Sequence, residues 1–250
     1  FRTREFEQME MQFFVKPEES DEWFETWKER RKAFYDTIGI NPDHLRFHEH
    51  GPDELAHYAR AAFDVEYKFP IGWSELEGIH NRSDFDLRQH EEFSGKSMSY
   101  RDPQTNQVYT PFIIETSAGC DRTTLAVMCE AYEEETLPDG SVRTVMHFHP
   151  RLAPIKVAIL PLVKKGGLKE LASELKDKLK RHFNVFYDEK GAIGRRYRRM
   201  DEAGTPYCVT VDFDTLEDQA VTVRDRDSME QIRVPMDELQ AWLAERILIT

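Results

Sequence analysis

The strongest constraint on the fold lies in the second half of the chain, where strand and helix patterns alternate. Residues 155–160 form an apolar run, and Val185–Tyr187 forms a second, shorter one. Between them, apolar residues recur every three or four positions, which is the spacing of one helix face. These are Leu168, Leu171, Ala172, Leu175 and Leu179. A strand, a helix and a strand in this order predict a βαβ unit of an α/β domain.

The same alternation continues to the end of the chain and suggests a domain boundary. We predict a helix at residues 193–202, strands at residues 207–211, 220–224 and 231–234, and a final helix at residues 236–247. Because the pattern begins just after Arg151, the predicted domains are residues 1–150 and residues 151–250.

The first half also mixes helices and strands, in a less regular order. Strand patterns occur at residues 1–10, 75–79 and 108–114, and helix patterns occur at residues 21–38, at residues 53–63 and from Thr123 onward. In residues 75–79, carboxylates alternate with apolar side chains, as in a half-buried strand. The predicted fold class is therefore α+β in the first half and α/β in the second.

Composition excludes several classes of protein. The 250 residues are 40% hydrophobic and carry a net charge of −13, which argues against unspecific coating of DNA. No stretch approaches the roughly 18 apolar residues of a membrane span, and no signal segment opens the chain, so we expect a cytosolic protein. We expect Cys120, Cys129 and Cys208 to be buried free thiols, without a disulfide or a metal. Because Phe1 begins inside a motif, we expect a piece of a longer protein.

The first ten residues combine cations, an aromatic ring and carboxylates. Strand alternation would put Arg2, Arg4, Phe6, Gln8 and Glu10 on one face. Such a face can hold a triphosphate with its arginines, stack a purine on Phe6 and bind an amine with Glu10. The alternative is a solvated edge strand with ion pairs between strands.

A second polar segment lies where a predicted strand runs into an apolar helix. Glu115 and Ser117 come at the end of the strand, and Gly119, Asp121 and Arg122 come at the start of the helix. Helix N-termini favour anions, and an arginine can bind phosphate with two nitrogens, so this junction suits a phosphate group. Helix capping by Ser117 or Asp121 explains only part of the pattern. Together with residues 1–10, this strand-to-helix junction suggests half of an ATP pocket.

Three further side chains could serve such a pocket. Glu75 and Glu77 are candidates for Mg²⁺ or for a hydrogen bond with the adenine amine, although either could equally be a solvated carboxylate. Arg82 could meet a carboxylate or a phosphate. His147 and His149 alternate on a strand pattern without a third nearby ligand, so we do not expect a zinc site there.

A basic patch stands out on this acidic chain. It comprises Arg195, Arg196, Tyr197, Arg198 and Arg199. Contact with RNA phosphates and stacking on Tyr197 are one interpretation, and a structural ion-pair network with Asp201 and Glu202 is the other.

These motifs together resemble a known family. They are FRTREFEQME at residues 1–10, ELEG at 75–78, NRSDFDL at 81–87, ETSAGCDR at 115–122, APIKV at 153–157, YRRMDEAGTP at 197–206 and VRDR at 223–226. The chain resembles the C-terminal portion of bacterial dimeric-type glycyl-tRNA synthetases, which are class II aminoacyl-tRNA synthetases, from within motif 2 onward. The resemblance implies an antiparallel catalytic sheet with helices, then an α/β anticodon-binding domain.

The resemblance also implies roles for the site residues. It implies ATP contacts for Phe1, Arg2, Arg4, Phe6, Glu75, Leu76, Gly119, Asp121 and Arg122, with Mg²⁺ bound alongside ATP and Glu75 a candidate ligand. Of these, Arg2 and Arg122 would be catalytic, and Arg122 would hold the γ-phosphate. It implies glycine contacts for Phe6, Gln8, Glu10, Arg82, Glu115 and Ser117. The partners implied are glycine and its tRNA, in a homodimer.

The implied reaction joins glycine to ATP as glycyl-adenylate and then transfers the glycyl group to the tRNA. The family's motif 1 and the first strand of its motif 2 are absent from these residues, so we do not expect this polypeptide to be active by itself. Two alternatives stay open. One is a non-catalytic paralogue that binds nucleic acid, and the other is a related class II synthetase for threonine, proline or histidine.

Overall fold

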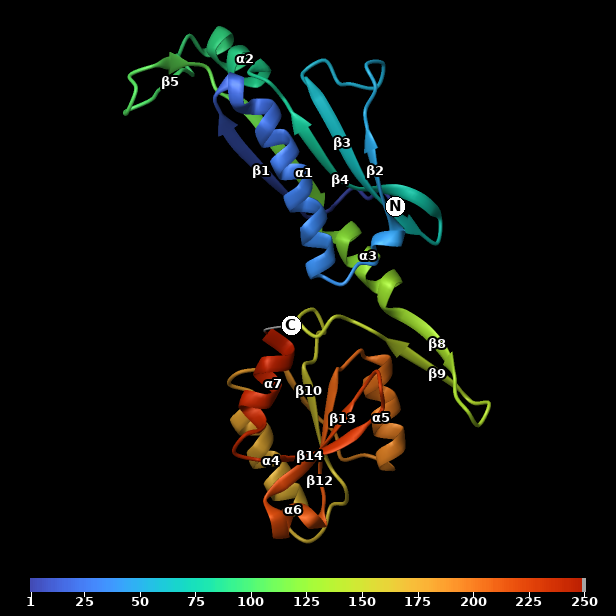
Figure 1. The fold of residues 1–250 in the computed structure, drawn as a ribbon. Coiled ribbons are helices and arrows are strands. Elements are labelled where there is room, and N and C mark those ends of the chain that lie inside the picture. Colours follow the sequence, from blue (N-terminus) through green and yellow to red (C-terminus); the bar gives the residue numbers. More distant parts are fainter. Residues whose placement is uncertain (249–250) are drawn as a thin grey trace. The chain divides into compact units, whose positions relative to one another are not determined.

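The computed structural model describes residues 1–248 and divides the chain into two compact units (Figure 1). The first unit comprises Phe1–Cys129, and the second begins at Glu130. This border lies about twenty residues before the predicted boundary at Arg151, because a hairpin before that residue packs with the second unit. Each unit has its own buried core.

A five-stranded antiparallel sheet forms the centre of the first unit. Across the sheet the strands run in the order β1 (Gln8–Val15), β7 (Phe112–Gly119), β4 (Gly72–Asn81), β3 (Ala61–Phe69) and β2 (Leu45–Glu49). The segments at the two ends of the first unit thus become neighbouring strands.

One long helix, α1 (Ser20–Thr37), covers one face of this sheet (Figure 1). It follows a short 3₁₀ turn at Pro17–Glu19, and a second such turn, Pro42–His44, comes after it. The helix packs Phe24 and Tyr35 against buried residues of the strands, including Ile79 and Ile114.

A buried carboxylate links α1 to the sheet. Glu77 of β4 is fully buried and accepts hydrogen bonds from the Tyr35 hydroxyl, at 2.5 Å, and from Arg31 Nε, at 2.6 Å. Burial and the adjacent Glu77 carboxylate raise the pKa of Tyr35 well above its ordinary value. Glu77 therefore serves the packing of α1, and it does not face a ligand.

The other elements of the first unit are short. They are α2 (Phe85–Ser94), α3 (Cys120–Ala131), and the paired strands β5 (Tyr100–Arg101) and β6 (Val108–Tyr109). Gly95 ends α2 in the left-handed conformation that glycine adopts without strain.

The second unit is built on a mixed five-stranded sheet. Its order is β11 (Val185–Tyr187), β10 (Val157–Pro161), β12 (Tyr207–Val211), β13 (Ala220–Asp225) and β14 (Gln231–Pro235). The first three strands are parallel, as the βαβ prediction requires, and the last two are antiparallel to their neighbours.

Helices cover both faces of this second sheet. The helices α4 (Leu168–Leu179) and α7 (Leu239–Leu248) share one core with the strands, and α5 (Ile193–Glu202) packs in a second, smaller core. A short helix, α6 (Phe213–Asp218), connects β12 to β13 and begins with a capping box at Asp212.

The hairpin of β8 (Tyr132–Thr136) and β9 (Val142–Met146) joins this unit through buried ions. Arg143 of β9 donates to Asp201 of α5 at 3.4 Å and to the carbonyl of Arg226 at 2.8 Å. Asp201 also accepts two hydrogen bonds from Arg224, at 2.8 and 3.1 Å. These contacts explain why the compact unit begins before Arg151.

Three predicted elements need correction. Residues 53–63 are not a helix: they form turns and then enter β3, which pairs with β2 on one side and with β4 on the other. The strand predicted at residues 1–10 begins only at Gln8. The strand predicted at residues 108–114 is divided between β6 and β7 at Pro111, which lacks the N–H of a strand residue.

The predictions omitted α2 and α6, which are short and mostly polar. The expected burial of the cysteines is wrong for Cys120: it is exposed near the start of α3, whereas Cys129 is partly buried and Cys208 is buried. Within residues 1–248, no helix has both the length and the apolar character needed to cross a membrane.

The buried carboxylate of Glu77 gives a test of the first unit. We expect Glu77→Ala to lower the free energy of unfolding by about 3 kcal/mol, because it leaves a buried hydroxyl and guanidinium without their anion. The measurement is urea unfolding, and the control is Glu92→Ala on the exposed surface of α2, for which we expect a change below about 0.5 kcal/mol. Equal effects of the two substitutions would contradict this role.

Candidate functional site

Strand register gathers polar side chains on the sheet face opposite α1. On β1 and β7, three cross-strand pairs lie side by side: Gln8 with Gly119, Glu10 with Ser117, and Gln12 with Glu115. On β4, Gly78 pairs with Ser117, and His80 pairs with Glu115. Successive members of each strand are two residues apart, so all of them point to one face. This polar face is the centre of the candidate site.

A cavity of about 310 Å³ opens beside this face. It is lined by Phe1, Arg2, Thr3, Phe6, Glu7, Gln8, Glu75, Leu76, Ser117, Gly119, Asp121 and Arg122. Most of the residues for which we expected ATP contacts therefore surround one space. Arg4 is the exception among them, because it is exposed and is not among the residues that line this cavity.

Arg122 is held in place at the wall of this cavity. Its Nη1 donates to the carbonyl of Glu75 at 2.9 Å and lies 3.6 Å from the Glu75 carboxylate. Its guanidinium carbon lies 4.5 Å from the centre of the Phe1 ring. Arg2, which is mostly exposed, approaches the same carboxylate at 3.9 Å. Two guanidinium groups thus flank the Glu75 carboxylate at the wall of the cavity.

The N-terminal segment is fixed at its end by the start of α3. The backbone N–H of Glu7 donates to Asp121 at 3.0 Å, and the N–H of Cys120 donates to the Glu7 carbonyl at 2.8 Å. Before Gln8 the backbone is not a strand, so the predicted alternation fails there: Phe1, Arg2 and Thr3 all line the cavity.

A second cavity of about 460 Å³ continues along the polar face. It is lined by Glu10, Gln12, Phe14, Arg82, Asp86, Leu87, His90, Ile113 and Glu115. The residues for which we expected glycine contacts therefore divide between the cavities: Phe6, Gln8 and Ser117 line the first, and Glu10, Arg82 and Glu115 line the second.

Arg82 bridges two carboxylates in the second cavity. It donates to Asp86 through Nε at 2.7 Å and to Glu115 through Nη1 at 3.1 Å. The hydrogen bond to Asp86 and the negative charges of both carboxylates raise the pKa of Arg82. Its guanidinium also lies 4.2 Å from the centre of the Tyr58 ring. The cation is thus held at a fixed position beside Glu115.

The two carboxylates of the ELEG segment serve different purposes. Glu75 lines the first cavity, whereas both oxygens of Glu77 bond to α1. The pairing with β3 shifts register between Val65 and Glu66, opposite this segment, so the two side chains do not follow one regular alternation. The candidate role of Glu77 toward Mg²⁺ or adenine is incompatible with this burial.

Sequence reasoning missed Gln12 and His80. Gln12 donates a hydrogen bond to Glu115, and His80 Nδ1 lies 3.7 Å from the same carboxylate. Burial lowers the pKa of His80. A Cβ atom at Gly78 would come within 2.7 Å of the His80 ring, so glycine at this position keeps room for the imidazole. Gln12 lies two residues after Glu10, and His80 lies two residues after Gly78. This strand alternation was the signal that could have placed both side chains on the polar face.

The basic patch on α5 does not act as one surface. Arg196 is only 2% exposed and donates to the carbonyls of Pro161, Asp188 and Leu162, at 2.7–3.1 Å. We therefore remove Arg196 from the candidate RNA contacts.

Its neighbour Tyr197 is also engaged within the unit, since its hydroxyl lies 2.6 Å from that of Thr210 and Arg224 lies over its ring. Of the other arginines, Arg198 approaches buried Asp201 at 3.9 Å, and Arg199 bonds to Asp188. Arg195 is exposed, and its side chain forms no hydrogen bond, ion pair or ring contact within residues 1–248.

Comparison with known proteins bears on both units. Residues 156–246 match the anticodon binding domain family, which agrees with the domain expected there. Among solved structures, the chain is similar to the prolyl-tRNA synthetase of Cryptosporidium parvum, solved with L-proline and AMP. That match has a TM-score of 0.70 at 17% identity, and it covers 98% of this chain and 50% of that one. It supports the class II fold.

Sequence relatives are closer. The chain is 58% identical over 244 residues to a glycine–tRNA ligase of Treponema denticola, which covers 96% of this chain and 54% of the relative. It is 55% identical to that of Clostridium acetobutylicum, over 99% of this chain and 53% of the relative. The chain thus spans about half the length of the curated relatives that it matches. Within that span, it belongs to the glycine–tRNA ligase family.

Proposed function

We propose that the protein activates glycine with ATP and transfers the glycyl group to the 3′ end of the glycine tRNA. The observation that carries the proposal is the polar face of β1, β7 and β4, which leads directly into the cavity around Arg122. Cations for phosphate and carboxylates for an ammonium group lie next to each other there. The high identity to glycine–tRNA ligases supports glycine as the amino acid.

ATP would occupy the cavity of about 310 Å³. Arg122 and Arg2 supply positive charge for the triphosphate, with Arg122 toward the γ-phosphate, and Phe6 supplies a ring for stacking on adenine. Phe1, Glu75 and Leu76 form a further part of the wall. We keep Arg4 as a candidate that would have to turn toward the ligand.

The start of α3 adds a further favourable feature for phosphate. The helix begins at Cys120, directly after Gly119, and both Gly119 and Asp121 line the cavity. Unpaired N–H groups at a helix start attract anions. Asp121 holds the N-terminal segment at Glu7, so its role would be to shape the pocket, since an anion does not bind phosphate.

Glycine would bind on the polar face beyond the phosphates. Its ammonium group would meet Glu10, Ser117 and Glu115, and its carboxylate would lie toward Arg82. Gln8 and Gln12 donate to Glu10 and Glu115, which orients those two carboxylates. Crowding by these groups around the glycine Cα would leave no room for a methyl group.

The chemistry then needs positioning and charge neutralisation, without a covalent enzyme nucleophile. An oxygen of the glycine carboxylate forms a bond to the α-phosphorus, and the bond from that phosphorus to the pyrophosphate oxygen breaks. A terminal hydroxyl of the tRNA next attacks the glycyl carbonyl, and AMP leaves. Arg2 and Arg122 would stabilise the charge on the phosphates.

We include Mg²⁺ bound with ATP in this proposal. Mg²⁺ prefers one or two carboxylates together with phosphate oxygens, and Glu75 offers a carboxylate at the cavity wall. Glu77 does not fit, because its oxygens are bonded to α1. A homodimer and a cytosolic location complete the proposal, and they rest on the family resemblance and on composition.

The direct test is glycine-dependent exchange of pyrophosphate into ATP by the protein expressed from its complete reading frame. We expect exchange with glycine and none with alanine, serine or threonine. Arg122→Ala should lower kcat/KM about 100-fold or more, because it removes a positioned cation. Arg101→Ala, on β5 and remote from the cavity lining, is the matched control. Exchange with proline, threonine or histidine instead, or with no amino acid, would contradict the proposal.

The size limit on the amino acid has its own test. We expect Ser117→Gly to raise alanine activation relative to glycine about tenfold, because it removes atoms next to the expected Cα position. The measurement is the ratio of kcat/KM for the two amino acids. If that ratio does not change, Ser117 takes no part in excluding the methyl group.

We propose that the second unit contacts tRNA, with Arg195 as the main candidate on α5 and with Arg198 and Arg199 beside it. Arg195→Ala should weaken tRNA binding and lower the slope of log affinity against log salt by about 1, the effect of one lost phosphate contact. The control is Arg181→Ala, another exposed arginine in the same unit. The same loss in both variants would contradict a specific role for Arg195.

A further inference from the structure

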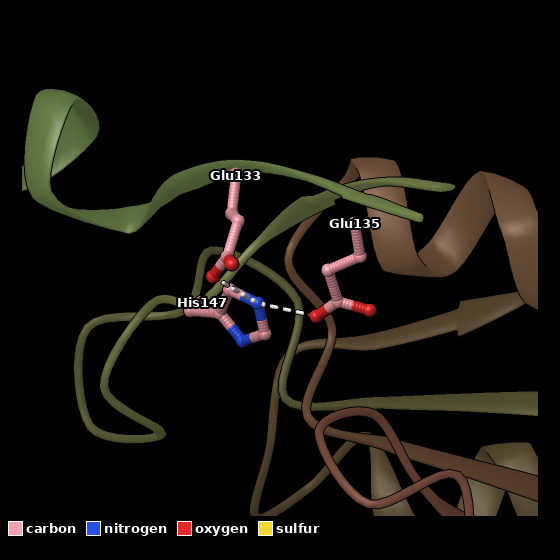
Figure 2. Close-up of side chains that lie close together, drawn as sticks. All are labelled: Glu133, Glu135 and His147. Atoms are coloured by element: carbon pink, nitrogen blue, oxygen red, sulfur yellow. Dashed lines mark hydrogen bonds and ion pairs between the residues drawn. The ribbon is translucent and has the colours of Figure 1, made fainter. Parts of the chain in front are cut away.

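The hairpin of β8 and β9 carries a cluster of side chains outside the proposed active site. Glu133 and Glu135 are two residues apart on β8, and His147 follows the end of β9, with its N–H bonded to the carbonyl of Ala131 at 2.6 Å. This pairing puts the three side chains on one face of the hairpin. Figure 2 shows both carboxylates turned toward the imidazole ring.

The donor atoms are spaced as the ligands of one ion would be. His147 Nε2 lies 2.9 Å from Glu135 Oε1 and 3.4 Å from Glu133 Oε2. One such atom from each residue lies within 4.8 Å of the others. Two ligands of a tetrahedral Zn²⁺, each about 2.0–2.1 Å from the metal, are themselves about 3.3 Å apart. Small shifts would therefore place all three on one metal ion.

A fourth residue orients the imidazole. His147 Nδ1 lies 2.6 Å from Oδ1 of Asp227, in the turn that follows β13. With the ring proton on Nδ1, the lone pair of Nε2 points at Glu133 and Glu135. A carboxylate on the far nitrogen of a metal-binding histidine is the usual second partner of such sites.

The ring cannot satisfy all of these carboxylates as a neutral group. It has one N–H, and carboxylate oxygens lie within hydrogen-bond distance of both nitrogens. If the proton is on Nδ1, then Nε2 and two carboxylates face one another as three acceptors. A cation at this point removes the conflict: it is either a second proton on the ring or a metal ion.

Nearby arginines leave this point open for a cation. Arg143 pairs with Glu135 through the other oxygen, Oε2, at 2.7 Å from Nε. Arg226 pairs with both oxygens of Asp227, at 2.7 and 2.9 Å. Within residues 1–248, neither arginine forms a hydrogen bond or ion pair with Glu135 Oε1 or with Glu133. Three carboxylates thus lie around the His147 imidazole, and the two nearby arginines already bond to Glu135 Oε2 and to Asp227.

We propose that Glu133, Glu135 and His147 bind a divalent transition metal of the Zn²⁺ type, with Asp227 orienting the histidine. Two carboxylate oxygens and one imidazole nitrogen match such an ion. The side chain of Glu133 is 62% exposed, so water has access to the fourth position. All four residues belong to the second unit, and the ion would tie the hairpin to the turn after β13.

The alternation of His147 and His149 does not reveal this site, because the two further ligands lie on the facing strand β8. Only the register between β8 and β9 brings them beside His147. His149 is not part of the cluster: its Nδ1 accepts the N–H of Arg151 at 3.3 Å. His149 lies two residues after His147 and therefore provides a matched control.

The test is equilibrium dialysis of the 250-residue chain against Zn²⁺ alone after treatment with a chelator, with metal counted per chain. We expect one Zn²⁺ per chain, with a dissociation constant at least about tenfold higher in His147→Gln and in Glu133→Gln. His149→Gln and Glu134→Gln should bind like the parent chain. Glu133 is exposed, so Glu133→Gln stays informative even if His147→Gln does not fold.

Three results would overturn the proposal. They are the absence of stoichiometric Zn²⁺, unchanged affinity in Glu133→Gln, and equal losses in the control variants. Nitrogen NMR of the imidazole provides an independent readout. Loss of the Nε2 proton signal on adding Zn²⁺ supports metal binding, whereas a ring that keeps protons on both nitrogens is an imidazolium ion paired with carboxylates.

Discussion

The candidate site depends on the register between β1, β7 and β4. Glu10 lies opposite Ser117, Gln12 lies opposite Glu115, and Gly78 lies on the other side of Ser117. Because side chains alternate between the two faces of a strand, a slip of one residue would turn this set toward α1 and would bring apolar residues to the polar face. The chemistry proposed for this unit therefore rests on a backbone pairing.

Buried ions link helices to strands in both units. Glu77 links α1 to the sheet through Tyr35 and Arg31, and Asp201 links α5 to Arg143 and Arg224. Such groups are costly to bury, and removing one partner leaves the other uncompensated. They explain why some charged residues in these motifs do not face a ligand. Arg196, which is buried and donates to three backbone carbonyls, is the clearest case.

Most helices and strands of the second unit could be predicted from the local pattern of apolar and polar residues. The helix at α5 and the strand at β12 agree with the predicted ranges. Ile193, Tyr197 and Met200 have helix spacing, and Tyr207–Val211 is a short, mostly apolar run directly after Pro206. The first unit was harder to predict. Residues 53–63 have helix-like spacing, but residues 53–60 form turns and irregular structure, and residues 61–63 pair with β4. Sequence motifs identified most residues of the candidate site, whereas Gln12 and His80 required the register.

The most direct measurement is a crystal structure of the protein with a non-hydrolysable analogue of glycyl-adenylate. The account predicts that the analogue's ammonium group lies within hydrogen-bond distance of Ser117 and Glu115, and that its adenine lies beside Phe6 in the cavity of Arg122. It would be contradicted by an analogue bound away from the polar face, or by an ammonium group that contacts none of Glu10, Ser117 and Glu115.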